Sequence, residues 1–97
     1  MARLGQSIQP NDGFYIDSLG WVYYQKGDYP KAVEHLERAV EITVDDPTII
    51  EHLADAYEKG GRGDRALQRY RQALKQAKET DQVKRLREKI QQLEKKI

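Results

Sequence analysis

Residues 13–46 read GFYIDSLGWVYYQKGDYPKAVEHLERAVEITVDD, and residues 47–80, which follow without a gap, read PTIIEHLADAYEKGGRGDRALQRYRQALKQAKET. When the second stretch is laid over the first, residues of the same kind coincide 34 positions apart. The coinciding pairs are Ile16 and Ile50, Leu19 and Leu53, Gly20 and Ala54, Tyr23 and Tyr57, Gly27 and Gly61, Ala32 and Ala66, Leu36 and Tyr70, and Ala39 and Ala73. A fixed period of this length is typical of supersecondary units that stack on one another. The sequence therefore predicts two copies of one structural unit.

Each unit is expected to contain two helices separated by a tight turn. The expected helices cover residues 13–26, 29–43, 47–59 and 64–78. Asp12, Asp28 and Asp46 each stand just before a helix, where an aspartate side chain can accept hydrogen bonds from free backbone N–H groups. Gly27 suits the turn of the first unit because glycine tolerates left-handed backbone. The pattern predicts an all-α fold of helix-turn-helix repeats.

Helical spacing also predicts the core. On the first helix, Ile16, Leu19, Gly20 and Tyr23 fall on one stripe. Facing stripes on the later helices comprise Ala32, Leu36, Ala39 and Val40, and then Ala66, Tyr70, Ala73 and Leu74. Gly20 and Ala54 are small, which indicates that another helix approaches closely at both positions. A single unit cannot bury such stripes alone, so the units are expected to stack.

The last segment, residues 81–97, departs from the repeat. Its apolar residues alternate spacings of three and four and leave the rest of the helix polar: Val83, Leu86, Ile90, Leu93 and Ile97. We expect a capping helix, because terminal repeats need a polar outer face. A two-stranded coiled coil and a basic amphipathic helix on an anionic membrane are the alternatives. No Gly or Pro separates this segment from the preceding helix, so one long continuous helix is a further alternative.

The two units resemble the tetratricopeptide repeat (TPR) family in length and in residue spacing. They depart from its pattern by Ile16 and Ile50 in place of the usual Trp, and by Val44 and Lys78 in place of the late Pro. The resemblance implies an α-solenoid with a right-handed superhelix. In it, residues 13–46 and 47–80 are two TPR units, and residues 81–97 are the cap.

Residues 1–12 look like the remnant of an upstream repeat or an added tail. The stretch from Ile8 to Asp12 lies one period before the stretch from Ile42 to Asp46, and Pro10 falls where the family keeps its late Pro. We therefore expect the chain to be a C-terminal fragment of a longer array. Its compact repeats are similar to those of bacterial members of the family.

Composition narrows the class of protein. With 97 residues, 34% of them charged and 38% apolar, the chain suits one soluble helical domain, in the cytoplasm or the periplasm. It lacks an apolar run near the ~20 residues that a membrane span needs. Residues 1–61 carry 5 Lys or Arg and 11 Asp or Glu, whereas residues 62–97 carry 12 and 5. This charge asymmetry bears on association rather than on fold.

Catalytic and metal-binding patterns are absent from the sequence. His35 and His52 have no His or Cys partner at ligand spacing, whereas zinc sites need three or four convergent ligands. Ser18 has no neighbouring His and Asp of a triad, and the glycine-rich stretch at residues 60–63 lacks the Lys and Ser or Thr of a phosphate loop. We expect neither an enzyme nor a bound metal or cofactor.

The resemblance implies a binding surface instead, because the concave face of such a superhelix is lined by the first helix of each repeat. The matching positions are Phe14, Asp17, Trp21 and Tyr24 on the first helix, and Thr48, Glu51, Asp55 and Glu58 on the third. Aromatic side chains are typical binding anchors, and carboxylates favour Lys or Arg on a partner. We therefore expect a peptide or protein partner with basic and apolar residues. Alternatively, these aromatics only pack against an upstream repeat.

The sequence also bears on other kinds of partner. Some family members clamp an acidic chaperone tail with Lys, Asn and Arg, but the matching positions here hold Asp17, Trp21, His52, Gln82 and Leu86. The sequence therefore predicts no acidic-tail clamp. Self-association is the alternative function, through an apolar patch at Leu19, Val22 and Tyr23 and through the basic C-terminal helix. Nucleic acid and membrane are not expected partners of residues 62–97, because basic residues there are interleaved with Glu and Gln.

Overall fold

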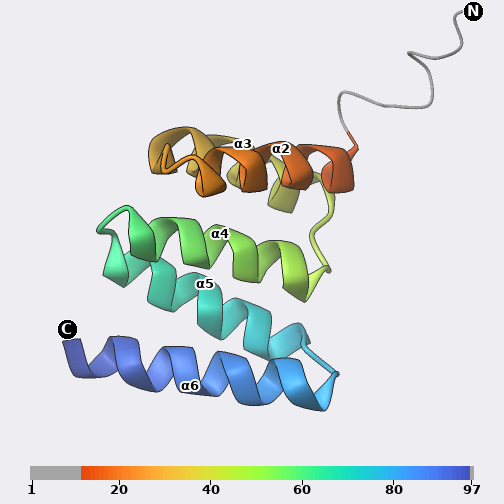
Figure 1. Cartoon of the computed structure of the whole chain (residues 1–97). Helices are drawn as coiled ribbons and strands as arrows, with labels where there is room; N and C mark the ends of the chain where they lie inside the picture. Colours follow the sequence, from red (N-terminus) through yellow and green to blue (C-terminus); the bar gives the residue numbers. More distant parts are fainter. Residues whose placement is uncertain (1–11, 97) are drawn as a thin grey trace, which may run out of the picture.

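Five helices make up the computed structural model, which describes residues 12–96 (Figure 1). They are α2 (Gly13–Gln25), α3 (Tyr29–Ile42), α4 (Pro47–Lys59), α5 (Gly63–Gln76) and α6 (Thr80–Lys96). The described range contains no strand. Each expected helix is present, with ends within two residues of the sequence prediction. The expected remnant in residues 1–12 lies, except for Asp12, outside the described residues.

Three helices begin at an aspartate cap, as the sequence predicted. Asp12 Oδ1 accepts from the backbone N–H of Phe14 at 2.9 Å, and Asp46 Oδ1 accepts from Thr48 at the same distance. Asp28 accepts from Lys31 at 3.3 Å. Each such cap contributes about 1 kcal/mol to helix stability. α5 differs, because the residue at its start, Arg62, makes no side-chain cap.

The two turns inside the units have the same geometry. Gly27 and Gly61 both have φ of 83°, a backbone conformation that strains any residue with a Cβ. The Asp28 N–H donates to the Tyr23 carbonyl at 2.9 Å, and the Arg62 N–H donates to the Tyr57 carbonyl at 2.8 Å. The turns therefore end α2 and α4 with the same six-residue hydrogen-bonded loop.

Consecutive helices lie side by side (Figure 1). Between them they bury one continuous core. Its fully enclosed large side chains are Leu36, Ile49, Ile50, Leu53, Tyr70 and Leu86. Gly20 is in close contact with α3, since a Cβ built there would lie 2.6 Å from Leu36 Cγ. The expected core differs at Leu19, Tyr23 and Leu74, which are only half-buried. The packing confirms stacked helical repeats, whereas the right-handed superhelix stays a prediction.

α6 is a separate helix, so the continuous-helix alternative is wrong. Ala77 ends α5 in extended backbone, with ψ of 136°, and α6 then packs back along α5. Leu86, Ile90 and Leu93 are buried, as expected of a cap. Val83 is half-buried, and Ile97 lies outside the described residues. None of the five helices is long and apolar enough to cross a membrane.

Candidate functional site

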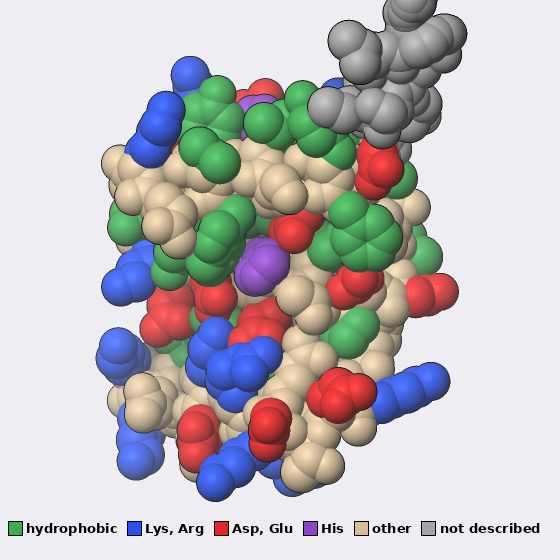
Figure 2. Space-filling model, turned by 45° about the vertical axis from the view of Figure 1, so that its right-hand side comes forward, with side chains coloured by type: hydrophobic (Ala, Val, Ile, Leu, Met, Phe, Trp, Pro, Cys, Tyr) green, Lys and Arg blue, Asp and Glu red, His purple; other side chains and the backbone are tan. Residues whose placement is uncertain are grey.

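Side chains of α2, α4 and α6 meet on one face of the molecule, which we call the α2–α4–α6 face. Asp17 of α2 bonds His52 of α4, and Glu51 of α4 bonds Arg85 of α6. The first helix of each unit and the C-terminal helix are therefore linked in series. Figure 2 shows hydrophobic side chains and a histidine gathered next to acidic and basic groups.

Three rings on this face form what we call the aromatic platform: Trp21, Tyr24 and His52. The Trp21 and Tyr24 rings are stacked, with centroids 4.4 Å apart and planes 6° apart. The His52 ring lies against the indole at 4.5 Å. Phe14, on the same side of α2, is 59% exposed. All of these rings are at least partly exposed, so aromatic surface remains accessible between α2 and α4.

The link between α2 and α4 is a hydrogen bond of 2.8 Å between His52 Nδ1 and Asp17 Oδ1. Burial alone would lower the pKa of His52, but the bond with Asp17 and the charges of Asp55 and Glu51 outweigh burial and raise it. The imidazole therefore holds its proton, and with it the ion pair, to higher pH than a free histidine.

Glu51 is the centre of the link between α4 and α6. It is only 3% exposed, yet its carboxylate accepts from Arg85 at 2.7 and 2.8 Å, from Lys89 at 2.8 Å and from Gln82 at 3.1 Å. Burial would raise the pKa of Glu51, but these four bonds lower it to about 2. The carboxylate is thus charged and fully engaged within the chain.

The remaining two carboxylates of the face bind the Tyr70 hydroxyl of α5. Tyr70 shares its hydroxyl proton between Asp55, at 2.5 Å, and Glu58, at 2.8 Å. Lys89 also donates to Asp55 at 3.0 Å. Burial and the two carboxylates raise the pKa of Tyr70 far above its ordinary value, so it remains a neutral donor. Asp55 and Glu58 are therefore partly used in holding α5.

The seven residues predicted for the groove lie on α2 and α4, but they divide into two groups. Phe14, Trp21 and Tyr24 present aromatic surface, whereas all four carboxylates already have partners within the chain: Asp17, Glu51, Asp55 and Glu58. Whether any of the seven contacts a partner stays a prediction.

Sequence reasoning missed the residues that neutralise those carboxylates, although the period contains the signal. Arg85 stands 34 residues after Glu51, and Lys89 stands 34 after Asp55. Residues one period apart occupy matching positions on successive first helices. An acidic residue followed one period later by a basic residue therefore indicates an ion pair between neighbouring units.

No group of three or more His, Asp or Glu side chains in residues 12–96 is arranged to hold a metal ion. The polar groups of the face pair with one another, and the face exposes aromatic rings beside these paired charges. Such a surface can bind another molecule noncovalently.

Comparison with known families agrees with this architecture. A model described as TPR repeat matches residues 20–61, and a model described as Tetratricopeptide repeat matches residues 48–84. A search of curated proteins found no match. The two family matches overlap and together cover α3, α4 and α5 completely, with parts of α2 and α6. The chain belongs to the tetratricopeptide repeat family.

Proposed function

We propose that the chain is an interaction module that binds a peptide or protein segment across the α2–α4–α6 face. TPR repeats generally mediate protein–protein interaction and are typically not catalytic. The observation that carries the proposal is the aromatic platform beside exposed Phe14. Stacked rings are rigid, so a partner gains large contact area at little entropic cost.

The charges of the face favour a partner with apolar and basic residues. Four carboxylates stand there against two permanent cations, Arg85 and Lys89. The face therefore keeps a negative excess even when His52 is protonated. Because each carboxylate is already bonded within the chain, we expect the rings to supply most of the affinity and the charges to supply orientation.

An array of immobilised peptides with graded apolar and basic content tests this proposal. Trp21 is the only tryptophan in the chain, so its emission also reports binding in solution. Phe14→Ala and Trp21→Ala are expected to weaken the binding of every peptide that wild type retains, by about tenfold or more for a true anchor. Val44→Ala is the control, because Val44 is 55% exposed and lies outside the face, between α3 and α4. Unchanged retention by both ring variants would refute the assignment.

Self-association is a second candidate, favoured by a neighbouring side of α2, about 100° around the helix from Phe14 and Trp21. There Val22 is 49% exposed and Tyr15 is 38% exposed. One period later the matching residues, Ala56 and Ile49, are 0% and 1% exposed because α3 covers them. The side of α2 formed by Tyr15, Leu19 and Val22 thus has the chemistry of an inter-repeat contact without a covering helix among the described residues. A second copy of this chain would bury it.

Analytical ultracentrifugation over a range of protein and salt concentrations tests this candidate. A self-associating wild type should become monomeric in Val22→Glu, whereas Phe14→Glu, outside the side formed by Tyr15, Leu19 and Val22, should leave assembly intact. A wild type that sediments as a monomer at every concentration rules the candidate out. The paired variants also separate the two functions, because Phe14 serves only the first.

A further inference from the structure

We propose a second binding surface, on the flank of the molecule, for an extended peptide in which a large apolar residue is followed by acidic residues. The flank comprises the start of α3, the end of α4 and the adjoining side of α5. It shares no residue with the aromatic platform, and its charge is of the opposite sign. The proposal therefore does not depend on binding at the α2–α4–α6 face.

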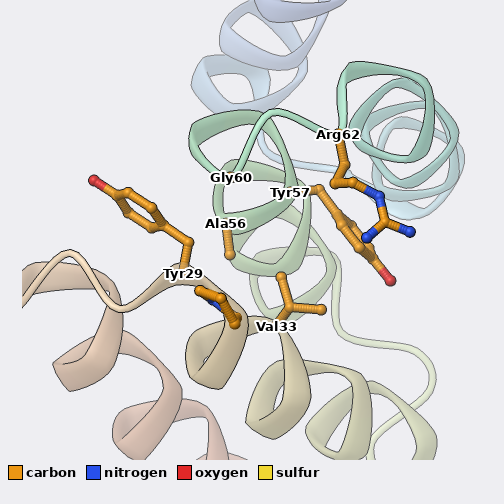
Figure 3. A pocket seen from close by; sticks show the side chains of 7 residues that line it. Tyr29, Val33, Ala56, Tyr57, Gly60 and Arg62 are labelled. Atoms are coloured by element: carbon orange, nitrogen blue, oxygen red, sulfur yellow. The ribbon is translucent and has the colours of Figure 1, made fainter.

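An apolar pocket forms one end of this flank (Figure 3). Val33 and Ala56 line its floor, Tyr29 and Tyr57 stand on opposite sides, and Arg62 lies beside Tyr57 at the rim. Its volume is about 250 Å³. Pockets for whole small molecules usually measure about 300–1,000 Å³. The size and lining therefore suit a single large aliphatic or aromatic side chain.

A row of arginines continues from the pocket along α5. Arg62, Arg65 and Arg69 are spaced by three and four residues, so they lie on one side of the helix. Arg65 and Arg69 line a second, polar depression of about 280 Å³, which meets the first pocket at Tyr57. The apolar pocket and the row of arginines are thus adjacent, and Tyr57 lines both depressions.

The cations of this row outnumber the anions that face them. Glu37 of α3 accepts from Arg69 at 2.9 Å and also from the Tyr57 hydroxyl. Within residues 12–96, no carboxylate lies within ion-pair distance of Arg62 or Arg65. Asp64 stands directly before Arg65 and two residues after Arg62, but a turn of about 100° per residue places it on another side of α5. The flank therefore favours an anionic partner.

The length of the arginine row limits how far apart the apolar and acidic residues of the partner can be. Seven residues of α-helix, from Arg62 to Arg69, rise about 10 Å. An extended peptide covers that length in about three residues. A segment that inserts an apolar side chain between Tyr29 and Tyr57 would therefore carry its carboxylates within the next three residues. A uniform polyanion would meet the arginines but leave the pocket empty.

Fluorescence anisotropy with three labelled peptides tests the proposal: a probe with Leu followed by three Glu, a version with Ser for Leu, and a version with Gln for each Glu. We expect the probe to bind about tenfold more tightly than the Ser version, because the leucine side chain leaves water when it enters the pocket. The Gln version should also lose most of the binding. A probe that does not bind, or a Ser version or a uridine RNA 12-mer that binds equally well, overturns the proposal.

Variants then locate the site. The double variant Arg62→Gln/Arg65→Gln should weaken binding of the probe about fivefold, which is the effect typical of losing two exposed ion pairs. Lys84→Gln/Arg87→Gln, with the same loss of charge on the exposed side of α6, should weaken it less than twofold. Val33→Phe should abolish the advantage of the Leu probe by filling the pocket, and Tyr29→Ala, which removes a wall, should do the same. Equal effects of the two double variants would show binding by net charge alone and contradict the site.

Discussion

The two repeat units share one pattern, but their first helices differ in burial. Leu53 and Tyr57 of α4 are 0% and 4% exposed, whereas Leu19 and Tyr23, the matching residues of α2, are only half-buried. α4 lies between α3 and α5, but α2 has described neighbours on fewer sides. The difference shows that a repeat position specifies a side chain's direction, while the neighbouring unit decides whether that side chain is core or surface.

Truncating the matched leucines should show the largest effect. Leu53→Ala is expected to cost about 2–5 kcal/mol of unfolding free energy, as for a fully enclosed leucine. Leu19→Ala should cost distinctly less, because its site is already open to solvent. Urea unfolding followed by circular dichroism measures both. Equal costs would mean that α2 is as enclosed as α4, contrary to the observed burial.

The ion pairs of Glu51 and Glu94 sharpen the same comparison between a buried site and an open one. Glu51→Gln should cost about 2 kcal/mol, less than for a fully buried pair because Arg85 and Lys89 can turn to solvent. The control is Glu94→Gln, whose partner Arg71 is exposed, and it should cost less than about 1 kcal/mol. Urea unfolding at neutral pH gives both values.

Acid should reproduce the effect of removing Glu51. Its pKa falls from 4.5 in the unfolded chain to about 2 in the fold. The stability it contributes is therefore present above pH 4.5 and is lost as pH falls toward 2. Wild type should lose more stability over that range than Glu51→Gln does. Parallel pH profiles of the two proteins would contradict the assigned role.

Much of the fold follows from the sequence because its determinants are local. The 34-residue spacing, the capping aspartates and Gly27 specify helices and turns without reference to distant residues. The break at Ala77 is marked by no Gly or Pro, although α6 packs back on α5 after it. The sequence predicted both the aromatic and the acidic residues of the candidate site, but not the basic side chains of α6 that pair with the carboxylates. Whether Glu51 is free to bind a partner depends on its contacts with α6. The sequence of α4 alone does not show those contacts.

A close contact at Gly20 distinguishes the units on a smaller scale. Gly20→Ala should destabilise by about 1–2 kcal/mol, because its methyl group would meet Leu36 at 2.6 Å and this clash exceeds the gain in helix propensity. The second unit already has Ala54 at the matching position, and there the residue that matches Leu36 is Tyr70. Changing Leu36→Ala together with Gly20→Ala should cost less than the sum of the two single changes. Additive costs would show that the two side chains do not compete for space.

The smallest effect concerns the hydrogen bond between His52 and Asp17, which is one of the contacts that join the two units. The pKa of His52 is raised above 6.5, so the stability of the pair is fully present below pH 6.5 and is lost as pH rises through the folded-state value. Trp21 reports this step, because a protonated imidazole quenches the emission of an indole that it touches. Emission should therefore rise with pH, with a midpoint above 6.5. Asp17→Asn should move the midpoint down, since it removes the charge that holds the proton. His35→Gln should leave it unchanged, because that ring lies against Tyr23 instead. If Asp17→Asn left the midpoint in place, the imidazole would not owe its proton to α2, and the polar contacts that join the two units would be chiefly those of Glu37 with Arg69 and Tyr57.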